Sequence, residues 1–463
     1  MKFMPVRRTL GTLFPLLMVS SAIAQGDYRT QREIINLGKH DNTVMELLTT
    51  LCTEIGPRTT GTPECQIACE WAAHKFKQFG LQNVHLEKWG EFPVLFSRGG
   101  MMSGKMVVPY EKELVFSSND WTPGTNGPRR GRVVIEPESI DAFEKAKSSL
   151  RGAWVLINKP VFMRGDRDLP QSDLDKMIST ADIAGRIYVS RDDDLVWTHG
   201  NPNVKWDSLP TIPSVMITGR EGRMIRRNLQ LGPVEAEFNL GNKFINKPVS
   251  LYNVVAEIPG TEKPDEVVIV SGHYDSWNGP GSQGAQDNGT GAMVALEAAR
   301  LLVRANAKPK RTIRFILWTG EEQGLLGSRQ YVKDHWLQLD RVSAMFVDDG
   351  GTNYQGGYTV LASQKPYFEE TVSLMNGAFP NLPMKLEVTG QLEGGGSDHN
   401  SFLDVGVPGI EAWETGTADY RWVWHTQNDR LETVIPEYLV QSSTNAALVS
   451  YNLACAKSLL PRK

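Results

Sequence analysis

The sequence EVVIVSGHYD at residues 266–275 decides how the chain folds. Its first six residues are mostly apolar, which is typical of a strand that is covered on both faces of a parallel sheet. A glycine and then His273 follow this strand directly. Because ligands of an open α/β sheet bind beyond the carboxyl ends of its strands, His273 stands where a functional site is expected.

Three further runs place carboxylates in equivalent positions. The run GAQDNG at 284–289 opens a predicted helix, WTGEE at 318–322 ends a predicted strand, and an acidic residue follows the apolar run 343–347. Since the carboxyl ends of parallel strands meet at one edge, these side chains are expected to gather there. The candidates are Asp287, Glu321, Glu322 and Asp349.

The residue types suit a metal site. Imidazole is a ligand for zinc, and Asp275, two residues after His273, is placed to accept the other ring N–H. Asp287 has two carboxylate oxygens and could bridge two ions, although an aspartate before a helix is also a common N-cap. Glu321 and Glu322 point in different directions, so one could bind metal while the other acts as a general base. Two acidic residues in the first turn of a helix are the alternative.

Two of the expected metal-ligand positions have an alternative candidate. Asp349 is preferred to its neighbour Asp348 as the ligand after the run 343–347. His425 is the expected last ligand, and His399 is the alternative. Each of these features is ambiguous alone, but together they supply a complete ligand set within one domain.

The surrounding pattern predicts a layered α/β domain. Residues 31–80 are expected to be helical, and strands and helices alternate from residue 251 onwards. Residues 113–247 instead show short strands between Pro-, Gly- and Asp-rich turns, which predicts an inserted domain. The catalytic domain would comprise residues 25–112 and 248–463. The neighbours of His74 indicate a solvated or packed side chain and not a ligand, whereas His199 has no partner cluster and is expected to be structural.

Composition restricts the class of protein. The 463 residues are 40% apolar and 22% charged, which is normal for a soluble globular protein, and the net charge of −4 does not suggest a nucleic-acid partner. Residues 1–24 have the basic, apolar and small-residue regions of a signal peptide cut after Ala24. The chain is therefore expected to be secreted or periplasmic, without a membrane partner.

The four cysteines are expected to be packed thiols or to include one disulfide; they are Cys52, Cys65, Cys69 and Cys455.

The order of these motifs resembles the M28 family of zinc peptidases. The runs GHYDSW (272–277), WTGEEQG (318–324), DGGT (349–352) and GVPG (406–409) look like its carboxypeptidase Q branch. The N-terminal runs IGPR (55–58) and GLQNVHLE (80–87) are similar too. The likeness spans most of residues 50–460 and is weakest across the predicted insert.

The resemblance implies a three-layer α/β/α domain with a mixed, largely parallel central sheet and a β-rich insert like a protease-associated domain. It implies two Zn²⁺ per chain, one held by His273 and Asp349, the other by Glu322 and His425, with Asp287 between them. Glu321 would be the base that takes a proton from the bridging water. Tyr420 is a candidate contact for the oxyanion or a substrate carboxylate, with packing as the alternative.

The implied function is exported exopeptidase activity on dipeptides or short peptides, of the carboxypeptidase or dipeptidase kind. Two alternatives remain open: an aminopeptidase, and an inactive binding module that has lost its metals. A homodimer is expected from the resemblance alone.

Overall fold

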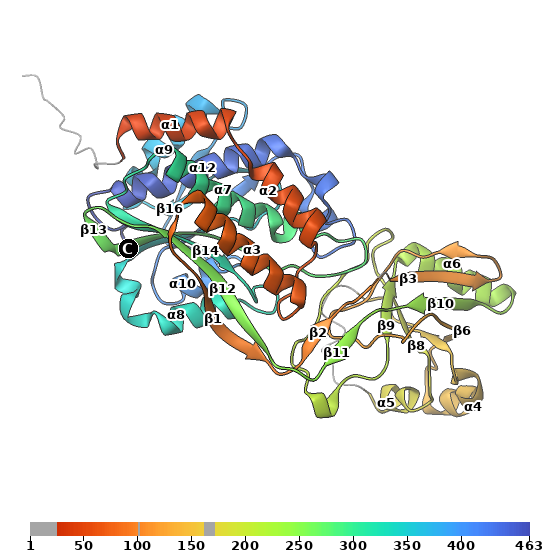
Figure 1. The fold of residues 1–463 in the computed structure, drawn as a ribbon. Helices are drawn as coiled ribbons and strands as arrows, with labels where there is room; N and C mark the ends of the chain where they lie inside the picture. The colour runs from red at the N-terminus through yellow and green to blue at the C-terminus, as the bar shows by residue number, and fades with distance from the viewer. Residues whose placement is uncertain (1–25, 101, 162–171) are drawn as a thin grey trace, which may run out of the picture.

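The structure is a computed structural model that describes residues 26–100, 102–161 and 172–463. The predicted signal peptide lies outside these residues. Figure 1 shows a larger lobe, in which helices cover a central sheet, and a smaller lobe beside it.

The larger lobe is built on a mixed sheet of eight strands. Its central strands β14, β13, β15 and β18 are parallel to one another, whereas β12 and β16 run antiparallel to their neighbours β14 and β18. In spatial order the strands are β1 (Gln82–Phe92), β12 (Val249–Ile258), β14 (Arg311–Trp318), β13 (Lys263–His273), β15 (Val342–Val347), β18 (Gly409–Thr415), β16 (Tyr354–Leu361) and β17 (Lys385–Thr389).

Helices cover both faces of this sheet, so the predicted three-layer α/β fold is confirmed (Figure 1). Alternate residues along each central strand pack to opposite faces, as Val268 and Ile269 do. One face carries α1 (Tyr28–His40), α2 (Val44–Thr50), α3 (Pro63–Phe79), α7 (Thr290–Arg304), α9 (Lys365–Ala378) and α12 (Pro436–Cys455). The other carries α8 (Leu326–Asp334) and α10 (His399–Leu403).

The smaller lobe contains a second sheet of eight strands with its own apolar core. A two-stranded ribbon of β2 (Leu95–Ser97) and β11 (Lys243–Ile245) leads into and out of this lobe. The sheet begins with β3 at Ser103, so its strands start before residue 113, where the sequence suggested that the insert begins. The strands are β4 (Lys112–Glu113), β3 (Ser103–Val108), β10 (Glu235–Asn239), β6 (Arg129–Ile135), β7 (Trp154–Leu156), β8 (Gly185–Val189), β9 (Ser214–Ile217) and β5 (Phe116–Ser117).

Three helices accompany the second sheet: α4 (Ile140–Leu150), α5 (Asp173–Ser179) and α6 (Gly219–Leu231). All four cysteines are buried thiols, which agrees with the packed-thiol alternative. Within the described residues, every helix is too short or too polar to cross a membrane.

Candidate metal centre

Three parallel strands bring the first functional side chains together. His273 is the last residue of β13, Glu321 and Glu322 come just after β14, and Asp349 comes two residues after β15. His273 pairs with Trp318 across the sheet, and Ser271 pairs with Val347. The register therefore places these four side chains at one edge of the sheet, as the sequence suggested.

Asp287 reaches the same edge from the loop before α7. Gly284 takes a left-handed conformation with φ +61°, and the turn Ala285–Gly289 departs from helical geometry at Asp287 and Asn288, which carries Asp287 inward. The Gln286 amide donates a 2.6 Å hydrogen bond to the Asp429 carboxylate. Asn288 donates to the Asp348 carbonyl at 2.6 Å and accepts from the Gly291 amide at 2.9 Å. Both ends of the loop are therefore held in place.

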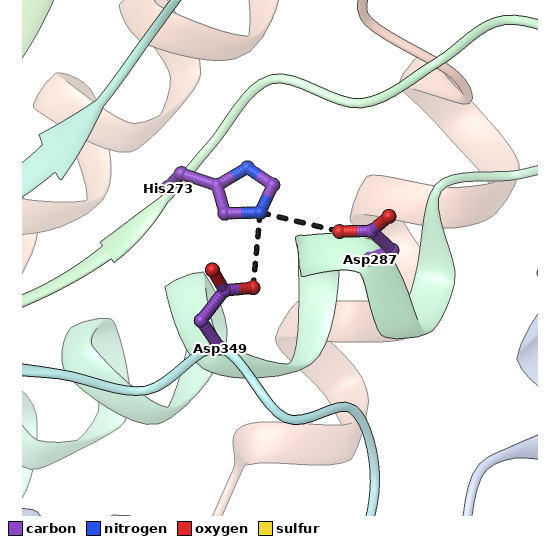
Figure 2. Close-up of side chains that lie close together, drawn as sticks. All are labelled: His273, Asp287 and Asp349. Carbon is purple, nitrogen blue, oxygen red and sulfur yellow. Dashed lines mark hydrogen bonds and ion pairs between the residues drawn. The ribbon is translucent and has the colours of Figure 1, made fainter. Parts of the chain in front are cut away.

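His273, Asp287 and Asp349 form a compact triad (Figure 2). The Nε2 atom of His273 lies 3.2 Å from Oδ1 of Asp287 and 3.1 Å from Oδ1 of Asp349. A divalent cation could replace these short contacts by coordination.

A second triad uses the other oxygen of Asp287. The Nε2 atom of His425 lies 3.2 Å from Oδ2 of Asp287 and 3.0 Å from Oε2 of Glu322. His425 stands in the loop after α11 (Tyr420–Val423), and its φ is +58°. The two triads thus share one carboxylate, which stands between them.

The donor set and its spacing fit zinc. Zinc bonds to nitrogen and oxygen of about 2.0–2.2 Å place tetrahedral ligand atoms roughly 3.3–3.6 Å apart. The contacts of 3.0–3.2 Å within each triad are slightly shorter than that spacing. Small side-chain movements would accommodate an ion in each triad, so the residues present fit two metal ions.

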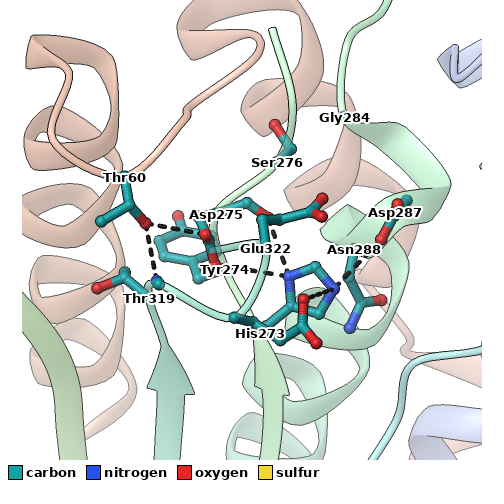
Figure 3. Close-up of polar contacts among 12 residues, drawn as sticks. Thr60, His273, Tyr274, Asp275, Ser276, Gly284, Asp287, Asn288, Thr319 and Glu322 are labelled. Carbon is teal, nitrogen blue, oxygen red and sulfur yellow. Dashed lines mark hydrogen bonds and ion pairs between the residues drawn. The ribbon is translucent and has the colours of Figure 1, made fainter. Parts of the chain in front are cut away.

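Asp275 supports His273 in a different way from the one expected. The nearest acceptor to His273 Nδ1 is the backbone carbonyl of Asp275, at 3.0 Å, whereas its carboxylate lies 3.6 Å away. That carboxylate instead accepts a 2.9 Å hydrogen bond from Thr60, which in turn accepts from the Gly320 amide at 2.8 Å (Figure 3). Asp275 therefore fixes both the ring and the loop that leads to Glu321.

Burial and crowding of acids dominate the electrostatics. Burial raises the pKa of Glu321 well above its usual range and raises the pKa of Glu322 to about 7. Burial lowers the pKa of His425, but the charges of Glu322 and Asp287 outweigh it and bring that pKa to about 9. Bound divalent cations would favour ionised carboxylates and neutral imidazoles, and so oppose these shifts.

The alternative ligand candidates, Asp348 and His399, lie outside the two triads. Asp348 turns away from the triads and accepts a 2.5 Å hydrogen bond from Gln355. His399 Nε2 accepts a 2.9 Å hydrogen bond from the Gly395 amide, and burial lowers the pKa of His399 to about 4. Neither belongs to a triad, so the structure brings together Asp349 and His425, the preferred candidates.

A cavity of about 450 Å³ opens over both triads. Its wall includes Tyr420, whose ring packs so closely on Gly351 that a Cβ at Gly351 would lie 2.6 Å from it. Such packing agrees with the structural alternative for Tyr420, although its place in the wall also allows contact with a substrate.

The expectation that His199 has no partner cluster was wrong. It is buried, it lines the cavity from the smaller lobe, and its ring centroid lies 4.8 Å from that of His425. No spacing in sequence connects residue 199 with residue 425, so only the packing of the two lobes reveals this contact. His74 is an exposed residue of α3, away from the triads, as expected.

Comparisons with known proteins agree with this geometry. The model of peptidase family M28 matches residues 253–450. Carboxypeptidase Q from Homo sapiens and from Mus musculus are each 30% identical to the chain, over 93% of it and 90% of their own length. An M28 peptidase precursor from Shewanella amazonensis has a similar fold, with a TM-score of 0.66, 24% identity and coverage of 93% of this chain and 98% of that one. A zinc aminopeptidase from Bacillus subtilis gives a TM-score of 0.58 at 23% identity, covering 91% and 98%. The chain belongs to peptidase family M28 and is a metallopeptidase.

Proposed function

We propose that the protein is an exported exopeptidase that hydrolyses dipeptides or short peptides with two zinc ions. One observation carries this proposal: two triads share the two oxygens of Asp287, and Glu321, which neither triad needs, lines the same cavity. Export rests on the signal-like residues 1–24. Similar proteins include carboxypeptidases and a zinc aminopeptidase, which supports exopeptidase chemistry.

Zinc bound in both triads would lower the pKa of a water molecule and polarise the scissile carbonyl. Glu321 stands beside the first triad, with its Oε2 3.9 Å from His273 Nε2. In the proposed reaction it takes a proton from the attacking water and returns it to the leaving amine, as a general base and then a general acid. Asp275 holds the His273 ring through its carbonyl and so keeps Nε2 directed at the triad.

The charged residues in the cavity wall indicate which terminus of a peptide could be recognised. Among the described residues that line it, there is no lysine or arginine to pair with a substrate carboxylate. Glu411 lines the cavity and belongs to neither triad. Burial raises the pKa of Glu411 to about 8, and a free ammonium group beside it would lower that pKa and pair with the carboxylate. This wall favours the second candidate, an aminopeptidase, over the carboxypeptidase suggested by the names of the curated relatives.

Three forms of one dipeptide test the proposal: the free dipeptide, its N-acetyl derivative and its C-terminal amide. Cleavage of the free dipeptide and the amide, without cleavage of the acetylated form, would establish amine recognition. Cleavage of the acetylated form but not of the amide would establish the carboxypeptidase. If a zinc-loaded protein cleaves none of the three or longer peptides, the binding-module alternative replaces the proposal.

A further inference from the structure

His425 lacks the support that His273 has. A histidine that binds metal almost always donates its other ring N–H to an acceptor, and this bond fixes the orientation of the ring. His273 has the Asp275 carbonyl for that purpose. The Nδ1 atom of His425 is buried and has no hydrogen-bond partner among the described residues. Its ring must therefore be oriented by other contacts.

The backbone on both sides of His425 is held by the smaller lobe. The Thr198 amide donates a 2.9 Å hydrogen bond to the His425 carbonyl, and Trp197 forms an antiparallel bridge with Thr426. Gln427 accepts from the Val196 amide at 3.1 Å and donates to the carbonyl of residue 194 at 2.8 Å. Residues 194–199 thus run beside the loop that carries His425 and are joined to it by one β-bridge and three hydrogen bonds.

Aromatic rings surround the imidazole of His425. The His199 ring meets it edge to face at a centroid distance of 4.8 Å, and Trp424 packs on it at 4.2 Å. Trp197 contacts Trp424 at 6.1 Å, and Trp277 lies 6.2 Å from His425. Such ring pairs favour particular geometries, so they can fix the plane of the imidazole without a hydrogen bond.

Residues 194–199 are themselves firmly attached to the smaller lobe. The Ser117 hydroxyl donates to the Trp197 carbonyl at 2.7 Å, and the Asp120 amide donates to the His199 carbonyl at 2.8 Å. The side chains of Trp197 and His199 are almost fully buried. The segment can therefore transmit the position of the smaller lobe to His425.

We infer that residues 194–199 are the positioning element of His425, with His199 as its positioning residue, so that the smaller lobe is required for the metal site of Glu322 and His425. The inference rests on the proposed two-metal centre. It gives the second lobe a role in metal binding and not only in shaping the cavity. Within the described residues, the hydrogen bonds and ion pairs of His273 are with residues of the larger lobe, so the site of His273 and Asp349 should be independent of the smaller lobe.

The test compares zinc binding by the full chain carrying His199→Ala, His199→Phe or Gln427→Ala, using competition with a chromogenic chelator. His199→Ala removes the ring, and Gln427→Ala removes two bonds between the lobes outside the cavity. Both should weaken the second zinc by about 10- to 100-fold, the usual effect of losing a group that orients a ligand, with the first zinc unchanged. His199→Phe keeps a ring and should restore most of the affinity. His74→Ala is the matched control, because His74 is exposed on α3.

The first zinc serves as an internal check that each variant is folded, and binding is measured without substrate, so the result does not depend on peptidase activity. Unchanged affinity for both zinc ions in His199→Ala and Gln427→Ala would overturn the inference. A higher KM for both His199 variants with normal zinc affinity would also overturn it, because His199 would then act by contacting substrate through its nitrogens.

Discussion

The Nε2 atom of His425 lies 3.2 Å from Oδ2 of Asp287, while Oδ1 of the same carboxylate faces His273. One short side chain therefore joins a candidate ligand at the end of β13 to a candidate ligand from the C-terminal part of the chain. The candidate metal centre is complete only when the loop after α11 folds back over the sheet edge.

Substituting Asp287→Ala should abolish binding of the second zinc and weaken the first by at least about tenfold, since both triads lose an oxygen ligand. Zinc per chain is measured by atomic emission after dialysis against a weak chelator. Asp207→Ala, at an exposed position of the smaller lobe, is the control. Retention of two tightly bound zinc ions by the Asp287 variant would show that this carboxylate is not the shared ligand.

Substituting Glu321→Gln should lower kcat by about 10²–10⁴-fold, because the amide cannot accept a proton from water. Zinc content should not change, since Glu321 belongs to neither triad. The measurement is dipeptide hydrolysis with zinc analysis of the same sample, and Glu46→Gln at an exposed site of α2 is the control. A fully active Glu321 variant would remove Glu321 from the reaction.

The ion pair between His335 and Glu87, at 3.1 Å, should contribute pH-dependent stability. The hydrogen bond to Glu87 raises the pKa of His335. The stability that protonated His335 contributes is therefore fully present below about pH 6.5 and is lost as pH rises through the raised pKa. Burial raises the pKa of Glu87, but His335 and His85 outweigh burial and leave that pKa lowered. The stability that Glu87 contributes is therefore present above about pH 4.5 and lost at more acidic pH.

The pair should therefore stabilise the fold most between about pH 5 and 6, by about 0.5–1 kcal/mol. Urea unfolding of the wild type and of His335→Gln across pH 4–9 measures the difference in free energy of unfolding. The difference should be greatest near pH 5.5 and shrink towards pH 9. A difference that is constant with pH would mean that the charge on His335 does not matter.

Asp120 and Arg98 form a buried ion pair where the two lobes meet. The Asp120 carboxylate also accepts from Thr59 at 2.7 Å and from the Asn278 amide at 3.3 Å. Asp120→Ala should cost about 3–5 kcal/mol of stability, because it leaves the Arg98 charge buried without its partner. Replacing both residues by Leu and Met should recover much of that loss in urea unfolding. A single variant as stable as the wild type would contradict the importance of this pair.

The sequence predicted the larger lobe well because its signals are local. The apolar run before His273 indicates a covered parallel strand, and parallel strands necessarily bring their carboxyl ends to one edge. The candidates Asp287, Glu322 and Asp349 followed from that rule. Predicted elements from residue 251 onwards are present, with ends shifted by a few residues, as for the strand expected at 266–271 and found at Lys263–His273.

Other features depend on contacts that leave no trace in a single sequence. His199 becomes part of the site only because its segment pairs with Thr426 from the other lobe. The His-x-Asp spacing places Asp275 near His273, but it cannot tell that the carbonyl would be nearer than the carboxylate. The second sheet begins at Ser103 because β3 pairs with β10, more than a hundred residues later, which no local pattern indicates.

Adding zinc to metal-free protein while following the hydrolysis of a free dipeptide shows whether this peptidase needs two zinc ions. We expect little activity at one zinc per chain, full activity at two, and no binding of the second ion by a His425→Ala variant. Full activity at one zinc per chain, or no hydrolysis of any peptide with two zinc ions bound, would contradict this expectation.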